Sequence, residues 1–301
     1  MKNEKRYFDL RQQKKTRDGI LFLLPAILSF LIFIAIPVCM SLGLIFADYN
    51  LLQPPEWTGF SHFKRLQIDP NIVQTLKNTF RYFIMLTPIH CILALVLAFA
   101  VTQVNNLKCR SVFRSIIYFP TIVTTASVAI VWMYMFSTDA GFINYYIRRL
   151  GFDNVPWMTD VNMIYVTIAI FSAWKFIGTT FLYYFVGLQN IPDTYYEAAK
   201  IDGAGRMQMF FKVSLPLLTP TIFFVFITNM IGVFQIFEEP YFLAANNPKA
   251  MSLALYIYQN AFDNIRIGYA SLLSMIMFLI ILTITVIQFI GQRKWVNYDY
   301  E

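Results

Sequence analysis

Long stretches without a charged side chain dominate this 301-residue sequence. The five stretches that hold no Asp, Glu, Lys or Arg are residues 19–47, 82–107, 115–138, 213–237 and 267–292. A sixth, 161–189, is interrupted only by Lys175. Because about 20 mostly apolar residues are enough for a helix to cross the hydrocarbon core of a bilayer, the sequence predicts an all-α, polytopic membrane protein with six transmembrane helices.

The composition supports this prediction. Hydrophobic residues make up 57% of the chain and charged residues only 14%, whereas soluble domains carry about 25% charged residues. The three cysteines lie far apart without the spacing of a metal site, so neither a disulfide framework nor a zinc site is expected. One transmembrane domain, 19–292, is therefore expected between a basic tail, 1–18, and a short tail, 293–301.

The distribution of Lys and Arg predicts the orientation of the spans. With the N-terminus inside, the inner segments hold fifteen of these residues and the longer outer loops hold eight. Short cytoplasmic loops carry an excess of Lys and Arg, so both termini are expected in the cytoplasm. The net charge is +7, and the Lys and Arg residues that cause it lie beside apolar segments. This position indicates contact with membrane lipid and no nucleic-acid partner.

The segment between the fourth and fifth spans, 190–212, is too polar to cross a membrane and too patterned for a slack loop. Pro192 ends the incoming helix, and Thr194 with Glu197 three residues later fits a capping box for a new one. Gly203 permits a reversal of the chain with positive φ. Short helices on the cytoplasmic face are therefore expected here.

This segment carries a known signature. Glu197, Ala198 and Ala199, followed by Gly203 and by Val213, Leu215 and Pro216, resemble the EAA motif of permease subunits in binding-protein-dependent ABC importers. Val213 stands where Ile is usual. Other stretches resemble landmarks of carbohydrate-importer permeases of the MalF/UgpA-like type, namely 58–66, 75–82, 113–123, 131–144, 187–205, 237–244 and 268–289. The resemblance covers nearly the whole chain and implies the fold of a type I ABC importer permease.

The resemblance implies that 190–212 is a coupling segment that docks on a cytoplasmic ATPase subunit. The residues expected to serve this coupling are Tyr196, Glu197, Ala198, Ala199, Asp202 and Gly203. The small alanines allow close helix approach, and Glu197 can pair with a basic residue of the ATPase. The alternative is that Glu197 only caps its helix.

The resemblance also implies the partners. These are a second permease subunit that forms a heterodimer with this chain, two cytoplasmic ABC ATPase subunits and an extracytoplasmic solute-binding protein, all at the bacterial cytoplasmic membrane. The chain itself is expected to be no enzyme and to bind no cofactor or metal, with ATP and Mg held by the ATPase subunits. It has no GxxxxGK[ST] motif, and its histidines, His62 and His90, have no catalytic or metal partner at a readable spacing.

Polar residues inside a span tend to face a cavity or the bundle interior. The candidates for the substrate path are Ser172, Trp174, Lys175, Thr179, Asn229 and Gln235. An aromatic face and planar hydrogen-bonding groups suit a sugar, although Trp174 and Lys175 equally fit an interfacial anchor or interhelical packing. Glu238 is a candidate for an outer gate or a binding-protein contact, while its neighbour Glu239 fits a solvated helix end better.

The sequence thus predicts a permease that moves a carbohydrate, an oligosaccharide in particular, by alternating access. A second reading keeps the same machinery and changes the cargo to a glycerol phosphate ester or another polar solute, against which the shortage of buried cations argues. A third reading is a stand-alone secondary transporter. That class predicts paired intramembrane acids, which the charge-free stretches do not offer.

Overall fold

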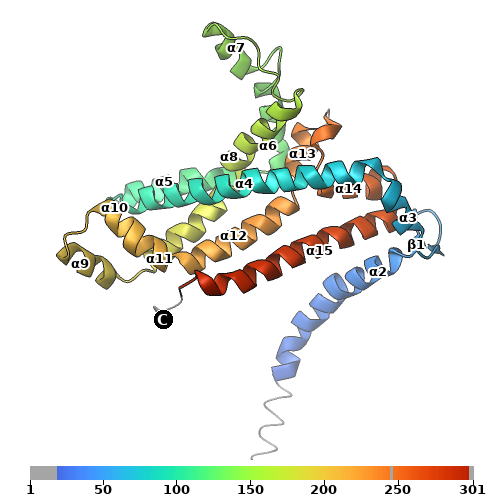
Figure 1. Ribbon diagram of the computed structural model, residues 1–301, viewed down its shortest axis with the longest axis horizontal. Helices are drawn as coiled ribbons and strands as arrows, with labels where there is room; N and C mark the ends of the chain where they lie inside the picture. Colours follow the sequence, from blue (N-terminus) through green and yellow to red (C-terminus); the bar gives the residue numbers. More distant parts are fainter. Residues whose placement is uncertain (1–18, 245–246, 298–301) are drawn as a thin grey trace, which may run out of the picture. The chain divides into compact units, whose positions relative to one another are not determined.

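The computed structural model describes residues 19–244 and 247–297, which are mostly helical (Figure 1). The chain divides into two compact units. Of the described residues, 19–67 and 260–275 form one unit, and 68–244, 247–259 and 276–297 form the other. The second unit holds the site discussed below.

The first unit begins with an apolar helix, Gly19–Leu44, whose outward surface is not buried by other parts of the chain. Its elements are η1 (Leu31–Ala35) and α2 (Ile36–Leu44) within that helix, β1 (Ala47–Asp48), β2 (Glu56–Trp57), α3 (Ser61–Ile68), η4 (Gln259–Asp263) and the start of α15 (Ile267–Gly291). The two short strands pair antiparallel, with Ala47 opposite Trp57.

Gly268 is closely surrounded by other atoms of this first unit. A Cβ atom at this position would collide with the carbonyl oxygen of Ala47 and with Nε2 of His62. His62 is itself buried, and its Nε2 lies 3.1 Å from the same Ala47 oxygen. The backbone N–H of Ile267 donates to the carbonyl of Tyr49 at 3.0 Å. The start of α15 therefore fits against the β1 turn because residue 268 has no side chain.

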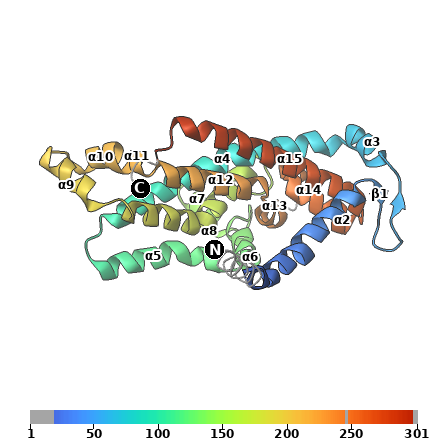
Figure 2. The same cartoon turned by 90° about the horizontal axis from the view of Figure 1, so that it is seen from below.

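The second unit is a helical bundle. Its elements are α4 (Pro70–Thr102), α5 (Leu107–Ile122), α6 (Thr125–Met135), α7 (Phe142–Arg149), α8 (Val161–Gln189), α9 (Asp193–Ile201), α10 (Arg206–Met209), η2 (Phe210–Ser214), α11 (Leu215–Leu217), α12 (Thr219–Phe234), α13 (Glu238–Leu243), η3 (Pro248–Ala250), α14 (Leu253–Tyr258), the rest of α15 and η5 (Gln292–Lys294). Within this unit α9 and α10 lie at one end, and α14 lies at the other (Figure 2).

Helix α8 is the centre of the bundle, because α4, α5, α12 and α13 all pack against it. It starts sharply at Asp160, whose carboxylate accepts hydrogen bonds from the backbone N–H groups of Asn162 and Met163 at 2.8 and 2.9 Å. Phe171 and Phe181 on this helix are fully buried and belong to two separate apolar clusters. Ile164 near its start and Leu188 near its end belong to the same two clusters, so both ends of α8 are anchored in the core.

Among the described residues, five helices are long and apolar enough to cross a membrane. They are Gly19–Leu44, Pro70–Thr102, Val161–Gln189, Thr219–Leu243 and Ile267–Lys294. The sixth predicted span, 115–138, is not one straight helix: α5 and α6 meet at an angle of 93°. Val123 and Thr124 between them are extended, with ψ of 145° and 134°. Pro120 in the last turn of α5 removes a backbone donor there, so the span is broken rather than kinked.

Other predicted boundaries also shift. The helix expected over 82–107 begins twelve residues earlier, because Asp69 caps it and Pro70 occupies its first position. The span expected over 213–237 is divided among η2, α11 and α12. Helix α12 ends at Phe234, and the candidate span Thr219–Leu243 continues beyond it as α13. Residues 235–237 then separate α12 from α13. Two spans of this unit are therefore interrupted, one at 123–124 and one at 235–237.

Candidate functional site: a polar cavity and a terminal helix

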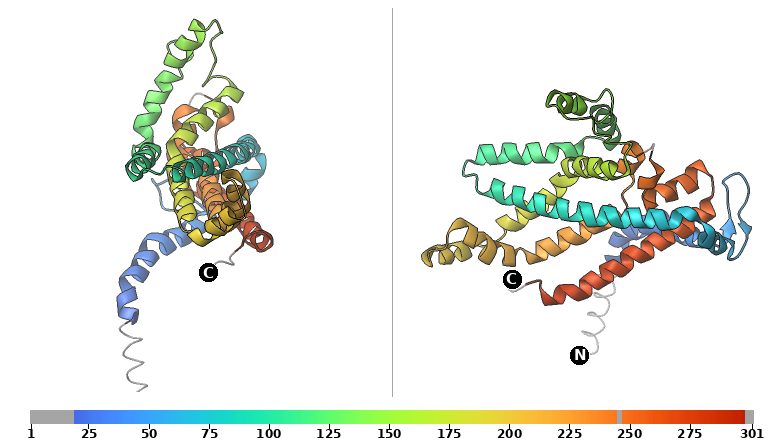
Figure 3. Two further views of the ribbon diagram at one scale, coloured as in Figure 1. Left: turned by 90° about the vertical axis from the view of Figure 1, so that its left-hand side faces the viewer. Right: turned by 45° about the horizontal axis from the view of Figure 1, so that its top comes forward.

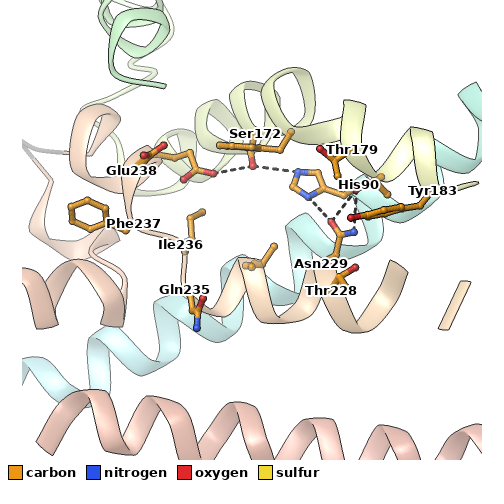
Figure 4. Close-up of a pocket in the computed structure, with 15 residues that line it drawn as sticks. His90, Ser172, Thr179, Tyr183, Thr228, Asn229, Gln235, Ile236, Phe237 and Glu238 are labelled. Atoms are coloured by element: carbon orange, nitrogen blue, oxygen red, sulfur yellow. Dashed lines mark hydrogen bonds between the residues drawn. The ribbon is translucent and has the colours of Figure 1, made fainter. Parts of the chain in front are cut away.

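A cavity of about 370 Å³ lies among four helices of the second unit. Its polar lining consists of His90 from α4, Ser172, Thr179 and Thr180 from α8, Thr228 and Asn229 from α12, and Gln235, Glu238 and Glu239 around the start of α13. Aromatic rings of Phe176, Tyr183 and Phe237 complete the walls (Figure 4). A cavity with apolar walls and a few placed polar groups is typical of a small-molecule site.

A chain of hydrogen bonds runs along this cavity. The hydroxyl of Ser172 lies 3.1 Å from Oε1 of Glu239 and 3.2 Å from Nε2 of His90. The other ring nitrogen of His90 lies 3.2 Å from Oδ1 of Asn229, whose amide donates to Thr180 at 3.1 Å. Figure 4 shows the part that links Ser172, His90 and Asn229. We call these five residues the relay, and it joins α4, α8, α12 and α13.

The proton count of the relay allows two arrangements. A serine hydroxyl has one proton, so Ser172 can donate to the Glu239 carboxylate only if Nε2 of His90 donates to Ser172. Since Nδ1 of His90 faces the Asn229 oxygen, the imidazole then carries both protons and a positive charge. In the other arrangement Glu239 is protonated and donates to Ser172, Ser172 donates to His90, and His90 is neutral. The net charge of the relay is zero in both.

The relay also contributes to the stability of the bundle, because most of its members are buried. Ser172, His90, Thr180 and Glu239 are 1%, 4%, 4% and 6% exposed. Buried polar groups that lose their partners cost about 1–3 kcal/mol each. The relay members therefore hold one another, and Thr179, Tyr183, Gln235 and Glu238 line the cavity outside it.

The structure brings most of the predicted substrate-path residues together. Ser172, Thr179, Asn229 and Gln235 line the cavity, and so does Glu238, the candidate for the outer gate. Trp174 and Lys175 do not line it. The ring of Trp174 packs 5.6 Å from that of Trp132, and the Lys175 side chain reaches the end of α5. Contact of these residues with a substrate stays a prediction.

Two features of the cavity were missed from the sequence. Glu239 is buried, not solvated, because α13 folds onto α8 and Ser172 reaches its carboxyl group. The partners of His90, which could not be read from the sequence, make it a member of the relay. A signal was present in the spacing: Ser172, Phe176, Thr179 and Tyr183 recur every three or four residues, which places them on one face of a helix.

The predicted coupling segment forms the end of the bundle, where α9 and α10 project (Figure 3, right). Gly203 has φ of +77°, as the sequence predicts for the reversal after α9. The predicted capping box is wrong: α9 begins after Pro192 without a side-chain cap. The cap occurs instead at α10, where Oε1 of Gln208 accepts from the backbone N–H of Gly205 at 3.0 Å.

Three of the side chains expected to contact a partner lie on the outside of this segment. Glu197, Ala198 and Asp202 are exposed, and Ala199 is half-buried. Tyr196 is also half-buried, and its hydroxyl hydrogen-bonds that of Ser214 at 2.9 Å. This bond fastens α9 to η2 at the entrance of the fifth span. Their coupling role itself stays a prediction.

A bundle of apolar helices around a polar cavity, with interrupted spans and an exposed helix at one end of the bundle, defines a membrane permease. Residues 91–296 match the family of binding-protein-dependent transport system inner membrane components. The chain belongs to this family. It is an ABC transporter permease of the inner membrane, and it is not an enzyme.

Relatives match over nearly their whole length. The chain is 35% identical over 294 residues to a probable ABC transporter permease protein, YesP, of Bacillus subtilis, covering 95% of this chain and 94% of the relative. It is 33% identical to the lactose transport system permease LacF of Rhizobium radiobacter, covering 96% of each chain. It is 30% identical to the arabinooligosaccharides transport system permease AraP of Bacillus subtilis, covering 93% and 89%.

Solved structures agree with the fold. A crystal structure of a bacterial ABC transporter involved in the import of the acidic polysaccharide alginate contains a chain with a TM-score of 0.84 and 25% identity. The match covers 95% of this chain and all of that one. A second alginate transporter structure, in complex with a periplasmic protein bound to alginate pentasaccharide, gives a TM-score of 0.80 at 25% identity over 94% and 96% of the two chains. The predicted type I importer permease fold is confirmed.

Proposed function

We propose that this chain is one permease subunit of an ATP-driven importer that carries a saccharide, in particular an oligosaccharide, across the bacterial cytoplasmic membrane. The observation that carries the proposal is the polar cavity among α4, α8, α12 and α13 in a chain similar along its length to saccharide permeases. Its volume of about 370 Å³ suits a segment of a small ligand.

The chemistry of the cavity fits a sugar. The rings of Phe176, Tyr183 and Phe237 can pack on the C–H faces of a pyranose, while Thr179, Gln235 and Glu238 offer donors and acceptors for its hydroxyl groups. All of these groups lie outside the relay, so binding a sugar need not break it. The Trp174 ring, which we expected to serve as a sugar platform, packs elsewhere.

A glycerol phosphate ester is the second candidate cargo. The chain is 30% identical to the sn-glycerol-3-phosphate transport permease UgpA of Agrobacterium fabrum, over 81% of this chain. The described residues that line the cavity include two glutamates and neither lysine nor arginine. A phosphate dianion would meet like charges there, so the proposal favours the sugar.

The proposed assembly contains a second, different permease, two cytoplasmic ATPase subunits and an extracytoplasmic binding protein. ATP and Mg would be held by the ATPases. The Lys and Arg distribution supports cytoplasmic termini and a cytoplasmic position for α9, where its exposed Glu197, Ala198 and Asp202 would meet an ATPase. This chain alone encloses the cavity only in part, which leaves room for a partner permease to complete it.

The transport step follows from this arrangement. ATP binding would draw the ATPases together and move α9, and α8 would carry this movement to the cavity walls. The cavity would then face the binding protein in one state and the cytoplasm in the other. Such a shift requires that ATP and the loaded binding protein favour different states of the bundle.

The test is ATPase activity of the purified complex in lipid nanodiscs with its binding protein. Neutral oligosaccharides and glycerol phosphates would be added in turn. Stimulation by a sugar is expected. Stimulation by a phosphate ester alone would replace the sugar with the second candidate, and a permease that purifies without any ATPase would contradict the proposal as a whole. A complex with Glu197→Ala serves as the control for coupling, because this exposed residue has no packing role in the chain.

A further inference from the structure

The break between α5 and α6 leaves backbone groups that need partners. The last carbonyls of a helix have no N–H donor within that helix. Inside a membrane there is no bulk water to replace these missing donors. Here the chain leaves α5 at Ile122 and passes through the extended residues Val123 and Thr124 before α6 starts. A break of this kind persists only where another part of the protein supplies donors.

Lys175 supplies these donors. Its ammonium group donates to the carbonyl of Pro120 at 2.8 Å, to that of Thr121 at 3.2 Å, and to that of Val123. An ammonium has three N–H groups, so all of them are used, and the positive charge lies at the negative end of the α5 dipole. The side chain is 2% exposed. From within α8, Lys175 therefore binds the end of α5 and Val123, the first residue of the α5–α6 break.

The backbones of α5 and α8 meet at the same place. The hydroxyl of Thr121 donates to the backbone carbonyl of Lys175 at 3.2 Å. One turn further along α8, a Cβ atom at Gly178 would lie 2.9 Å from Cα of Tyr118 and 3.0 Å from the carbonyl oxygen of Ile117. The end of α5 is thus held against α8 by hydrogen bonds in both directions and by close backbone contact.

The second break, between α12 and α13, is held by the same helix. Ser172 lies three residues before Lys175 and hence on the same side of α8. Its hydroxyl reaches Oε1 of Glu239, the second residue of α13. The segments beyond the two breaks, α6 and α13, pack against each other. One turn of α8 therefore contacts both breaks, and only residues 190–192 separate α8 from α9.

We infer that Lys175 and Ser172 are positioning residues that transmit the movement of α9 to α6 and α13, so that both interrupted spans open and close with α8. This inference rests on the proposed function, since it takes α9 as the part that the ATPases move. The lysine thus acts on transport without touching the cargo. If Lys175 only completed the fold of α5, its loss would lower ATP hydrolysis and transport together.

The test compares transport with ATP hydrolysis in proteoliposomes that hold the whole complex. Lys175→Met keeps the length of the side chain without its N–H groups, Lys175→Arg keeps donors, and Ser172→Ala removes the hydroxyl. Ile170→Ala is the matched control, because Ile170 lies on the exposed side of the same helix. Lys175→Met is expected to keep ATPase activity while the sugar carried per ATP falls about tenfold. Lys175→Arg should recover most of this loss, and Ile170→Ala should resemble the wild type.

The double variant decides whether the two residues act together. If both residues transmit the same movement, the double variant Ser172→Ala with Lys175→Met lowers the amount of sugar carried per ATP by less than the product of the two single effects. Effects that multiply, or equal losses of transport and hydrolysis, would overturn the inference. Should Lys175→Met fail to assemble, Ser172→Ala carries the test, and an unchanged ratio in that variant contradicts the inference. A wild-type complex with no sugar-stimulated activity would instead contradict the proposed function.

A distance measurement gives an independent readout. Spin labels at Tyr134 on α6 and Val186 on α8, both exposed, are introduced after Cys39, Cys91 and Cys109 are replaced by serine. In the wild type the distance should change when a non-hydrolysable ATP analogue is added. In Lys175→Met this change should disappear, while Ile170→Ala retains it. An ATP-dependent change of the same size in Lys175→Met would overturn the inference.

Discussion

Nδ1 of His90 lies 3.2 Å from Oδ1 of Asn229, and this contact joins the middle of α4 to α12 across the cavity. Asn229 also donates to the hydroxyl of Thr180 and to the backbone carbonyl of Val225, both at 3.1 Å. A single amide thus satisfies groups from three helices. Asn229 therefore holds two members of the relay, His90 and Thr180, and the backbone of its own helix.

Asn229→Leu is therefore expected to destabilise the permease. The change leaves His90 and Thr180 without this partner, and each buried polar group that loses its partner costs about 1–3 kcal/mol. The measurement is the thermal unfolding midpoint of the purified complex in nanodiscs. Thr228→Val is the control, because this neighbouring hydroxyl bonds only the backbone of its own helix at 3.0 Å. Equal midpoints for the two variants would show that the relay does not contribute to stability.

The adjacent glutamates give a matched pair. Glu239 is 6% exposed and accepts from Ser172, whereas Glu238 is exposed on the cavity wall. Glu239→Ala should lower the unfolding midpoint, because the Ser172 hydroxyl loses a buried partner worth about 1–3 kcal/mol. Glu238→Ala should change the free energy of unfolding by no more than about 0.5 kcal/mol, as other surface substitutions do, and so leave the midpoint nearly unchanged. It should, however, lower sugar uptake. The assignment of the two roles is wrong if Glu238→Ala is the more destabilising change.

Much of the fold could be predicted from runs of residues without charge. Helix α8 has the predicted bounds, because Asp160 caps its start and Pro192 follows its end. The positive φ at Gly203 also followed from the residue type. These features depend on local chemistry, which a single sequence displays.

The remaining features depend on tertiary contacts. A charge-free stretch such as 115–138 gives the length of a span but not whether it is straight, so the 93° turn at 123–124 was not predicted. Lys175 was a candidate both for the substrate path and for interhelical packing, since its sequence position shows its depth in the membrane and not its direction. In the structure its donors meet the carbonyls of α5. Glu239 is buried for the same kind of reason, because α13 folds back onto α8.

The start of α8 should respond to acid. The hydrogen bonds that Asp160 accepts from the backbone N–H groups of Met163 and Asn162 outweigh desolvation and lower the pKa of its carboxyl group below the usual value of about 3.9. A carboxylate whose pKa is lower in the folded state stabilises that state above the unfolded pKa. This contribution is lost as the pH falls through the folded value.

Asp160→Asn tests this dependence, because asparagine caps a helix without titrating. The measurement is hydrogen exchange of the backbone amides of Asn162 and Met163, compared between wild type and variant at each pH. Relative to the variant, the wild type should lose protection only below about pH 4. A constant ratio from pH 6 to pH 3 would show that the charge of Asp160 does not stabilise the helix start.

The last prediction concerns the turn between α9 and α10. Gly203 has φ of +77°, and no other atom lies within 4 Å of where its Cβ would be. A substitution here is therefore resisted by the backbone alone, at about 1–2 kcal/mol for a left-handed residue. Gly203→Asp should relax this turn, redirect α9 and abolish uptake while the subunit still inserts into the membrane. Gly205→Asp is the control, because Gly205 has φ of −71°, which any residue adopts. Uptake by cells, with the amount of inserted subunit measured by immunoblot, checks both variants. Normal uptake by Gly203→Asp would mean that the direction of α9 does not matter for transport, and a loss in both variants would mean that charge, rather than the turn, is responsible.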